Sequence, residues 1–449
     1  MTQPNFLDLV RRLEGHQAAG EWPAMLLEIT NLVIAMINDP RARGVVFGSA
    51  EMDRFCLAAG AMSSRQLGLS TPTAYNDQLA VHVATELYDQ QGGHTLALKD
   101  VIRARPDLTH VVLVTNLHDR PLQLERFNRD MEKPAQVLLA PALSLPDKLR
   151  WLQMQLAALK PGSLTLFSHH YDVAAIGAAQ PGVARETAYF HHADHDMALG
   201  VFLPHALHVD CTNLSHHQCR HHLGVSAQQA YWPLVSPDQG ERLGHAFMAD
   251  GQLLTCAHGS ANKFLAPGRY GYFDVLLRRL TEVGGEHIHL GTLPREELDG
   301  FRERLVGAGV DPARFRHQTP VPSLWAWLRD SRIDLCISSF PVQGAKGLVE
   351  TQGAGLPVLI QQSSLARLHS TRDLVYGEAL WWETPDDFIR VLQGLTPELL
   401  AEQASASRRF YDEWHHPREL AYALNNPRRT APCPPVRSTP CDTLALYLR

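Results

Sequence analysis

Long uninterrupted apolar runs are missing from the sequence. The longest apolar stretch, Pro23 to Ile37, is broken by Glu28, Thr30 and Asn31, and a membrane-spanning helix needs about 20 consecutive apolar residues. Charged residues also interrupt the N-terminal segment, where a secretory signal would need its apolar core. We therefore expect a cytoplasmic protein, and a peripheral position at the inner face of the membrane stays open.

The sequence also lacks a strong excess of charge of one sign. It carries 41 Lys and Arg against 47 Asp and Glu, for a formal net charge of -6, so no overall field attracts it to nucleic acid. Its seven cysteines are scattered and form no Cys-x-x-Cys pair, which indicates reduced thiols rather than a disulfide framework or a zinc knuckle. Any phosphate that the protein binds must be held by a local site.

A chain of 449 residues is long enough for two domains. Apolar residues recur at helical spacing up to about residue 66 and then give way to short apolar runs separated by helix-sized intervals. The strand-like runs are residues 79–84, 111–114, 137–140, 164–167 and 188–190, then 253–256, 287–290, 333–338 and 357–360. This alternation predicts two successive parallel α/β domains of Rossmann type that face each other across a cleft.

The expected divisions of the chain follow these patterns. They are a helical N-terminal appendage (1–75), a first α/β domain (76–240), a second α/β domain (241–400), a helix that braces the first domain (401–425) and a Pro-rich mobile tail (426–449).

The most informative segment is DLCISSFPVQGAKGLVETQGAGLPVLI, residues 334–360. A buried strand leads into a loop whose Gly344 and Gly347 let backbone N–H groups approach an anion, and a helix expected from Leu348 points its positive end at that anion. On the first turn of this helix, Glu350 is placed to accept hydrogen bonds from a ribose diol. The alternative is an ordinary strand–helix–strand unit with a Gly-rich turn.

This segment resembles the donor-nucleotide motif of two-domain glycosyltransferases with the GT-B architecture. The resemblance implies that Glu350 holds the ribose of a nucleotide sugar and that the backbone from Gly344 to Gly347 contacts its diphosphate. Val342 stands where the retaining branch of these enzymes usually has a second glutamate, so the segment is closer to the inverting branch that includes the O-linked N-acetylglucosamine transferases. Lys346 and Gly347 replace the paired threonines of that branch, and we count both among the candidate donor-binding residues.

A second segment, LLTCAHGSANK at residues 253–263, supports the same interpretation. It begins as a strand and ends in a small polar loop with Ser260, Asn262 and Lys263. In the enzymes that it resembles, a lysine in this loop contacts the diphosphate. Such a lysine neutralises the leaving nucleotide, which is work that a divalent metal does elsewhere. The alternative for Lys263 is a solvated surface residue.

The first domain carries a third segment, VHVATELYDQQGGHT at residues 81–95. It predicts a strand, a loop with Gly92 and Gly93, and a helix from about Thr95. It resembles the N-terminal glycine loop with which GT-B enzymes approach the sugar and the acceptor, which implies that His94 lies at the mouth of the cleft. The alternative is a capped helix start with an incidental histidine.

Histidine is frequent, with 24 copies, and the stretch YFHHADHDMALG at residues 189–200 has three open interpretations. Its His and Asp side chains are metal-ligand types, although the first His of the H-x-H-x-D-H signature of metallo-β-lactamase-like hydrolases falls on Phe190. The stretch also resembles a catalytic loop of bacterial GT-B enzymes, in which His195 takes a proton from the acceptor and Asp194 orients the ring or the sugar. The third interpretation is a run of half-buried polar residues.

The resemblance as a whole implies a GT-B glycosyltransferase that transfers a sugar from a UDP-sugar to an acceptor hydroxyl or amide. It also implies that the first domain (76–240) binds the acceptor and that the second domain (241–400) binds the nucleotide-sugar donor. The expected catalytic residues are His195, Asp194 and His94, and the expected sugar and acceptor loop carries Gly92, Gly93 and His192. No metal or other cofactor is expected, because no Asp-x-Asp motif stands near a donor strand, and Val342 favours inversion. The acceptor, whether glycan, lipid-linked sugar or protein, is not identified.

Other functions stay open at this point. A nucleotide-sugar epimerase or hydrolase can share the two-domain form, and a non-catalytic nucleotide-sugar-binding protein can keep the fold without chemistry. A zinc hydrolase is the third alternative. The histidine pairs at residues 169–170, 216–217 and 221–222 receive no role, because they are typical of surfaces and helix ends.

Overall fold

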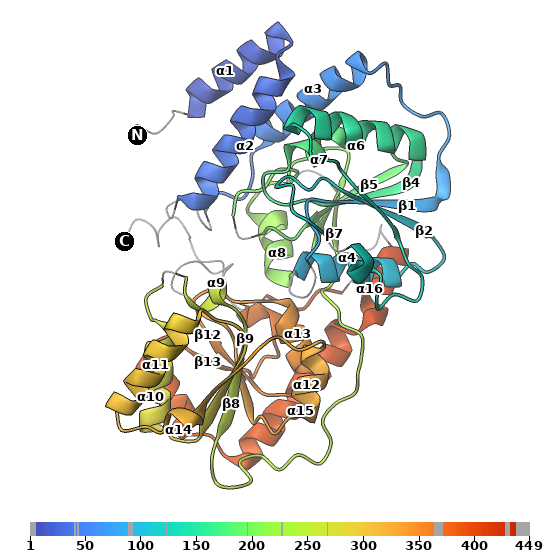
Figure 1. Ribbon diagram of the computed structural model, residues 1–449. Helices are drawn as coiled ribbons and strands as arrows, with labels where there is room; N and C mark the ends of the chain where they lie inside the picture. The colour runs from blue at the N-terminus through green and yellow to red at the C-terminus, as the bar shows by residue number, and fades with distance from the viewer. Residues whose placement is uncertain are drawn as a thin grey trace. The chain divides into compact units, whose positions relative to one another are not determined.

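The chain folds into two compact units (Figure 1). The computed structural model describes residues 6–39, 42, 45–88, 93–122, 124–194, 196–225, 228–266, 268–362, 371–426 and 432–436. The first unit comprises Met1–Trp232 and Ala421–Pro432, and the second comprises Pro233–Leu420 and Cys433–Arg449.

The division after Trp232 lies earlier than the expected boundary at residue 240, because the second unit holds the segment in between. The hydroxyl of Tyr411 donates a hydrogen bond to the carbonyl oxygen of Ser236 at 2.6 Å. The Arg408 guanidinium lies 2.7 Å from the carboxylate of Asp238. These contacts place the segment from Pro233 onward with the second sheet.

The first unit contains a seven-stranded sheet in the order β3-β2-β1-β4-β5-β6-β7, and all of its strand pairs are parallel. Its strands are β1 (Asn76–Ala84), β2 (Thr109–Val114), β3 (Gln136–Leu139), β4 (Pro161–Phe167), β5 (Glu186–His191), β6 (Leu207–Asp210) and β7 (Gln229–Tyr231). In the central strands, Val81 lies opposite Val111 on one side and Leu164 on the other. Such apolar runs suit parallel strands that are buried on both faces.

The helices of the first unit are α1 (Phe6–Ala19), α2 (Trp22–Asn38), α3 (Ala50–Gln66), α4 (Gly93–Arg103), α5 (Leu124–Phe127), α6 (Leu145–Leu159), α7 (Val173–Ala178) and α8 (Asn213–His221). The N-terminal segment expected to be a helical appendage forms helices α1, α2 and α3, which belong to the core of the first unit. Helix α3 packs on α7, and α2 packs on α3 and α6 (Figure 1). Trp22 and Phe55 are buried in one hydrophobic core with Val81 and Leu164, so apolar burial joins α1–α3 to the sheet.

The second unit contains a six-stranded sheet in the order β10-β9-β8-β11-β12-β13, again with parallel pairs. Its strands are β8 (Leu254–Ser260), β9 (Glu286–Thr292), β10 (Phe315–Gln318), β11 (Leu335–Ile337), β12 (Val358–Gln361) and β13 (Leu380–Trp382). The core beneath them includes the buried side chains of Leu335, Ile337, Phe340 and Trp382. Two Rossmann-like units, as expected, therefore make up the fold.

The helices of the second unit begin and end at recognisable signals. They are α9 (Ala261–Phe264), α10 (Tyr272–Glu282), α11 (Arg295–Gly307), α12 (Leu324–Asp330), α13 (Lys346–Gly353), α14 (Pro385–Gln393) and α15 (Pro397–Trp414), with short 3-10 turns η1 (Pro312–Arg314) and η3 (Arg372–Leu374). At α14, the Thr384 hydroxyl accepts from the Asp387 N–H and the Asp387 carboxylate accepts from the Thr384 N–H, which is a capping box.

The helix expected at residues 401–425 is in fact two helices. Helix α15 ends at Trp414, and α16 (Pro417–Asn425) begins at a proline, which cannot continue a preceding helix. Helix α15 packs on α13 in the second unit, whereas the chain from Ala421 groups with the first unit. The expected tail at 426–449 lies largely outside the described residues. Within the described chain, no helix has the length and apolar character of a membrane span.

Candidate functional site

The sheet of the first unit changes its direction of winding between β1 and β4. From β1 the chain proceeds outward through β2 and β3, and it then returns to β4 on the other side of β1. In open α/β sheets, ligands bind outside the carboxyl ends of the strands at such a point. The loops that follow β1 and β4 are therefore the candidate ligand site of this unit.

Three histidines meet at this edge of the first sheet. His94 stands at the start of α4 after β1, His169 follows β4, and His192 follows β5. The ring centroid of His94 lies 4.8 Å from that of His169 and 5.2 Å from that of His192. One nitrogen of each ring lies within 4.8 Å of the others, and the ring of Tyr88 lies 5.2 Å from that of His94.

All three imidazoles are neutral at physiological pH. Burial, with a smaller contribution from His169, lowers the pKa of His94 to about 4. Burial and then the proximity of His118 lower the pKa of His169 to about 4. Burial, His94 and His169 hold the pKa of His192 well below its ordinary value. A neutral imidazole carries a lone pair that can accept a proton or bind a cation.

The tautomer of His94 follows from its contacts. Its Nε2 lies 3.1 Å from the carbonyl oxygen of Glu86, and a carbonyl can only accept, so Nε2 carries the hydrogen. The lone pair of His94 is therefore on Nδ1. This is the atom that can take a proton from a bound molecule.

The structure describes some of the other residues predicted for the first unit but not all of them. Gly93 is exposed and opens α4. Asp194 accepts a hydrogen bond of 3.2 Å from the hydroxyl of Thr212. Gly92 and His195 lie outside the described residues. The structure thus brings together His94 and His192 and adds His169, for which the sequence pattern gave no role.

The second sheet changes its direction of winding between β8 and β11. The chain leaves β8 through β9 to β10 on one side, and it enters β11 on the other side of β8. The polar loop expected after β8 is instead the end of the strand and a short helix, because Ser260 ends β8 while Asn262 and Lys263 lie on α9. Gly344 lies in the loop after β11, whereas Lys346 and Gly347 open α13, which begins two residues before the expected Leu348. The predicted donor residues of these two segments therefore lie at the corresponding ligand position of this sheet.

Lys263 and Gly344 lie in direct contact across these two segments. A Cβ atom at Gly344 would collide with the Lys263 ammonium, so a larger residue there would displace the end of the lysine side chain. Burial lowers the pKa of Lys263, because a half-buried ammonium loses part of its hydration. A bound anion at this point would compensate for that loss.

The N-terminus of α13 lies beside this lysine and has an open first turn. Ala345 at the N-cap position gives no side-chain hydrogen bond to the helix, so the helix offers backbone N–H donors and a partial positive charge. A Cβ atom at Gly347 would collide with the imidazole of His258, whose Nε2 lies 3.3 Å from the hydroxyl of Thr351. The sequence pattern placed His258 in the polar segment before Lys263 but gave it no role.

The remaining predicted donor residues lie close by. Lys346 is buried, and its ammonium donates to the carbonyl oxygen of Val235. Glu350 is half-buried on α13. The hydroxyl of Ser260 donates a hydrogen bond of 2.6 Å to the side chain of Asn262. Lys346 therefore faces the start of the second unit, and its backbone N–H is the group that lies at the helix start.

Several solved structures resemble this chain. A mutant of the O-GlcNAc transferase from Thermobaculum terrenum matches with a TM-score of 0.55 and 15% identity, over 94% of this chain and 81% of its own. HepE from Anabaena in complex with UDP and glucose matches with a TM-score of 0.55 and 11% identity, over 78% of this chain and 99% of its own. Sucrose-phosphate synthase from Thermosynechococcus elongatus matches with a TM-score of 0.58 and 11% identity, over 78% of this chain and 98% of its own. The chain has the GT-B fold.

The GT-B fold confirms the architecture expected from the sequence. No family model and no curated protein matches the chain. At such low identity the likeness concerns the GT-B fold, and the roles of single residues stay predictions.

Proposed function

We propose that this GT-B protein is a glycosyltransferase that takes a sugar from a UDP-sugar and transfers it to an acceptor hydroxyl or amide. The observation that carries the proposal is the Lys263 ammonium against Gly344, beside the N-terminus of α13 and at the change of winding of the second sheet. HepE, which has a similar fold, was solved with UDP and with UDP-glucose, which supports the choice of UDP.

The second unit is proposed to bind the donor. The Lys263 ammonium and the backbone N–H groups of Gly344, Lys346 and Gly347 neutralise the diphosphate as the bond between sugar and diphosphate breaks. Ser260 at the end of β8 and Asn262 on α9 complete the polar part of this donor site. Glu350 on α13 accepts hydrogen bonds from the ribose hydroxyls.

The first unit is proposed to bind and activate the acceptor. As the acceptor atom attacks the anomeric carbon, His94 or His195 accepts its proton, and the electrons of the broken bond leave with the diphosphate. Asp194 orients the catalytic ring or the sugar. The proposed sugar and acceptor loop consists of Gly92, Gly93 and His192.

Two finer points belong to the proposal. The positive charge at Lys263 and the α13 amides does the work that a divalent ion does in other transferases, so we propose that transfer needs no metal. Val342 places an apolar side chain where the retaining branch usually has a glutamate, so we propose inversion. The acceptor is a glycan, a lipid-linked sugar or a protein.

Thermal unfolding with nucleotides tests the donor site. The protein is heated with UDP, GDP, CMP or ADP, and each series is run with and without EDTA. A ligand at about a hundred times its dissociation constant stabilises the native state by roughly 2.7 kcal/mol. The readout is the shift that each nucleotide causes at a fixed EDTA concentration, so an effect of EDTA on the protein itself cancels.

The proposal expects a shift with UDP that EDTA does not abolish. A shift with another nucleotide alone would contradict UDP as the nucleotide of the donor. No shift with any nucleotide would contradict the donor site. Consumption of a UDP-sugar without an added acceptor would instead indicate an epimerase or hydrolase. Tight UDP binding without turnover of UDP-sugars in the presence of glycan, lipid-linked and peptide acceptors would indicate a binding protein.

A further inference from the structure

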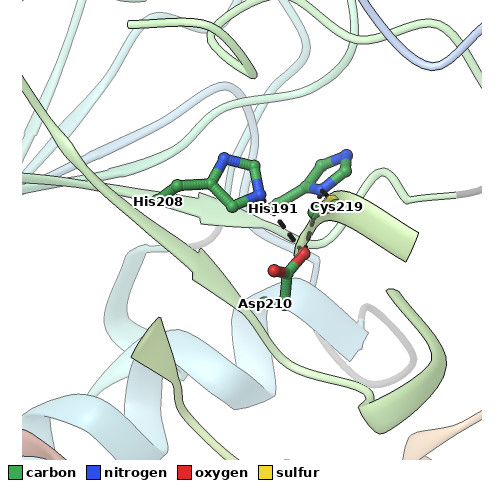
Figure 2. Close-up of side chains that lie close together, drawn as sticks. All are labelled: His191, His208, Asp210 and Cys219. Atoms are coloured by element: carbon green, nitrogen blue, oxygen red, sulfur yellow. Dashed lines mark hydrogen bonds and ion pairs between the residues drawn. The ribbon is translucent and has the colours of Figure 1, made fainter. Parts of the chain in front are cut away.

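A second cluster of four side chains lies in the first unit and shares no residue with the three imidazoles described above. It consists of His191 at the end of β5, His208 and Asp210 on β6, and Cys219 on α8. Figure 2 shows these four side chains grouped at one place. All four are buried, with between 0% and 1% of each residue exposed.

The strand register explains why three of these side chains meet. His191 is the direct neighbour of Asp210 across the β5–β6 pair. His208 lies two residues before Asp210, and side chains two residues apart on a strand point to the same face. Helix α8 packs on β6 and adds Cys219 from a different element. Four potential ligands therefore converge from two strands and a helix.

All four ligand atoms lie within 4.8 Å of one another, and three of the distances between them are close to the edges of a tetrahedral metal site. Nδ1 of His191 lies 3.2 Å from Oδ1 of Asp210, and Nε2 of His208 lies 3.3 Å from the same oxygen. Sγ of Cys219 lies 3.4 Å from Nδ1 of His191. With bonds of about 2.0–2.3 Å from zinc to nitrogen, oxygen and sulfur, the edges of a tetrahedron are about 3.3–3.6 Å.

Two arrangements satisfy these atoms. Without an ion, the two imidazoles donate to the Asp210 carboxylate, and the Cys219 thiol also interacts with that carboxylate. Nδ1 of His191 faces both the Asp210 carboxylate and the Cys219 sulfur. A cation between the atoms satisfies all four at once, because nitrogen, oxygen and sulfur then each direct a lone pair at it.

The surroundings of the cluster fit a closed site. His216 on α8 is buried, and its Nδ1 lies 3.5 Å from Oδ2 of Asp210, the oxygen that does not face His191. A second group on the far oxygen orients a ligating carboxylate. Two imidazoles, a carboxylate and a thiol suit zinc, and four protein ligands leave no position for a substrate. The site is therefore structural.

We propose that His191, His208, Asp210 and Cys219 bind one zinc ion as a closed structural site of the first unit. The ion joins the ends of β5 and β6 to α8 and so fixes the residue after His191, which is His192 of the other cluster. This proposal departs from the expectation of a protein without metal. It does not depend on the proposed transfer reaction, in which no metal takes part.

Metal analysis of the full chain tests the site. The protein is produced with zinc in the medium, dialysed against metal-free buffer and measured by mass spectrometry of its metals. Wild type is expected to retain one zinc ion per chain, and Cys219→Ser is expected to lose it. Cys211→Ser is the matched control, because Cys211 is also buried and lies next to Asp210 but outside the cluster.

Exchange of zinc for cobalt gives a measurement that needs no variant. A tetrahedral cobalt site with one thiolate is expected to show intense visible absorption and a charge-transfer band from sulfur to cobalt. Wild-type protein with neither zinc nor these bands would overturn the proposal. Zinc that stays in folded Cys219→Ser would also overturn it, because the ion would then lie elsewhere, for example at His94, His169 and His192.

Discussion

The backbone N–H of Val342 donates a hydrogen bond to the carbonyl oxygen of Lys263, with 3.2 Å between the two atoms. This bond joins α9, which follows β8, to the loop after β11, and these two segments flank the change of winding in the second sheet. It holds the backbone of Lys263 while the ammonium lies against Gly344. A positive charge that is fixed before a ligand arrives needs little reorganisation when a diphosphate binds.

Removal of this charge is expected to weaken nucleotide binding. Lys263→Ala leaves the loop backbone intact but removes a charged donor, and hydrogen bonds to charged groups contribute about 1.5–3 kcal/mol. We expect UDP affinity to fall by about 10- to 100-fold, as measured by titration calorimetry. Arg295→Ala is the control, because it removes an exposed positive charge from α11 of the same unit. Equal UDP affinity in wild type and Lys263→Ala would contradict the donor site.

Gly347 offers a test of shape rather than charge. Gly347→Ala places a Cβ atom against the His258 imidazole, and either the ring or the start of α13 must move. We expect a lower thermal midpoint and weaker UDP binding. Gly300 in α11 has open space where its Cβ would lie, so Gly300→Ala should stabilise its helix by up to about 1 kcal/mol. Similar behaviour of the two variants would show that Gly347 is not constrained by His258.

Acid is expected to destabilise the first unit through its neutral imidazoles. The pKa of His169 is about 4 in the folded protein and 6.5 in its ordinary state, so between these values the unfolded chain binds a proton that the folded chain does not. The stability contribution is complete above pH 6.5 and is lost as the pH falls toward 4.

The variant His169→Gln removes the group that binds this proton, and so removes its contribution to the pH dependence of stability. Its loss of unfolding free energy between pH 7 and pH 5 should be smaller than that of wild type by about 1–2 kcal/mol, as measured by denaturant titration at the two pH values. His222→Gln is the control, because His222 is exposed. An unchanged difference between pH 7 and pH 5 in His169→Gln would show that this imidazole does not resist protonation.

The sequence allowed the fold and one half of the candidate site to be predicted, because both depend on local patterns. Short apolar runs marked β1, β4, β8 and β11, and the polar segments at the ends of β8 and β11 placed Lys263 and the Gly344 to Gly347 segment at strand ends. Parallel strands in a winding sheet then bring such loops to one edge. The contact between Lys263 and Gly344 is a consequence of that topology.

The cluster around Asp210 could not be predicted in the same way. Strand β6 has only four residues, Leu207–Asp210, and its alternating polar side chains do not form an apolar run. The partnership of Asp210 with His191 is a register between strands, which a single sequence does not contain. His169 was missed for a related reason, since its role comes from the proximity of the ends of β1, β4 and β5.

Replacement of His94 should separate acceptor activation from donor binding. His94→Gln keeps a polar side chain of similar size but removes the lone pair on Nδ1, and general base catalysis contributes about 10²- to 10⁴-fold to a rate. We expect the transfer rate to fall by that factor while UDP affinity stays the same, because Lys263 and Glu350 belong to the other unit. Transfer is measured as product formed from a UDP-sugar at saturating donor, and His222→Gln is the control. Full activity in His94→Gln would assign the proton transfer to His195, whereas full activity in the His195→Gln variant as well would contradict a histidine base at this edge of the sheet.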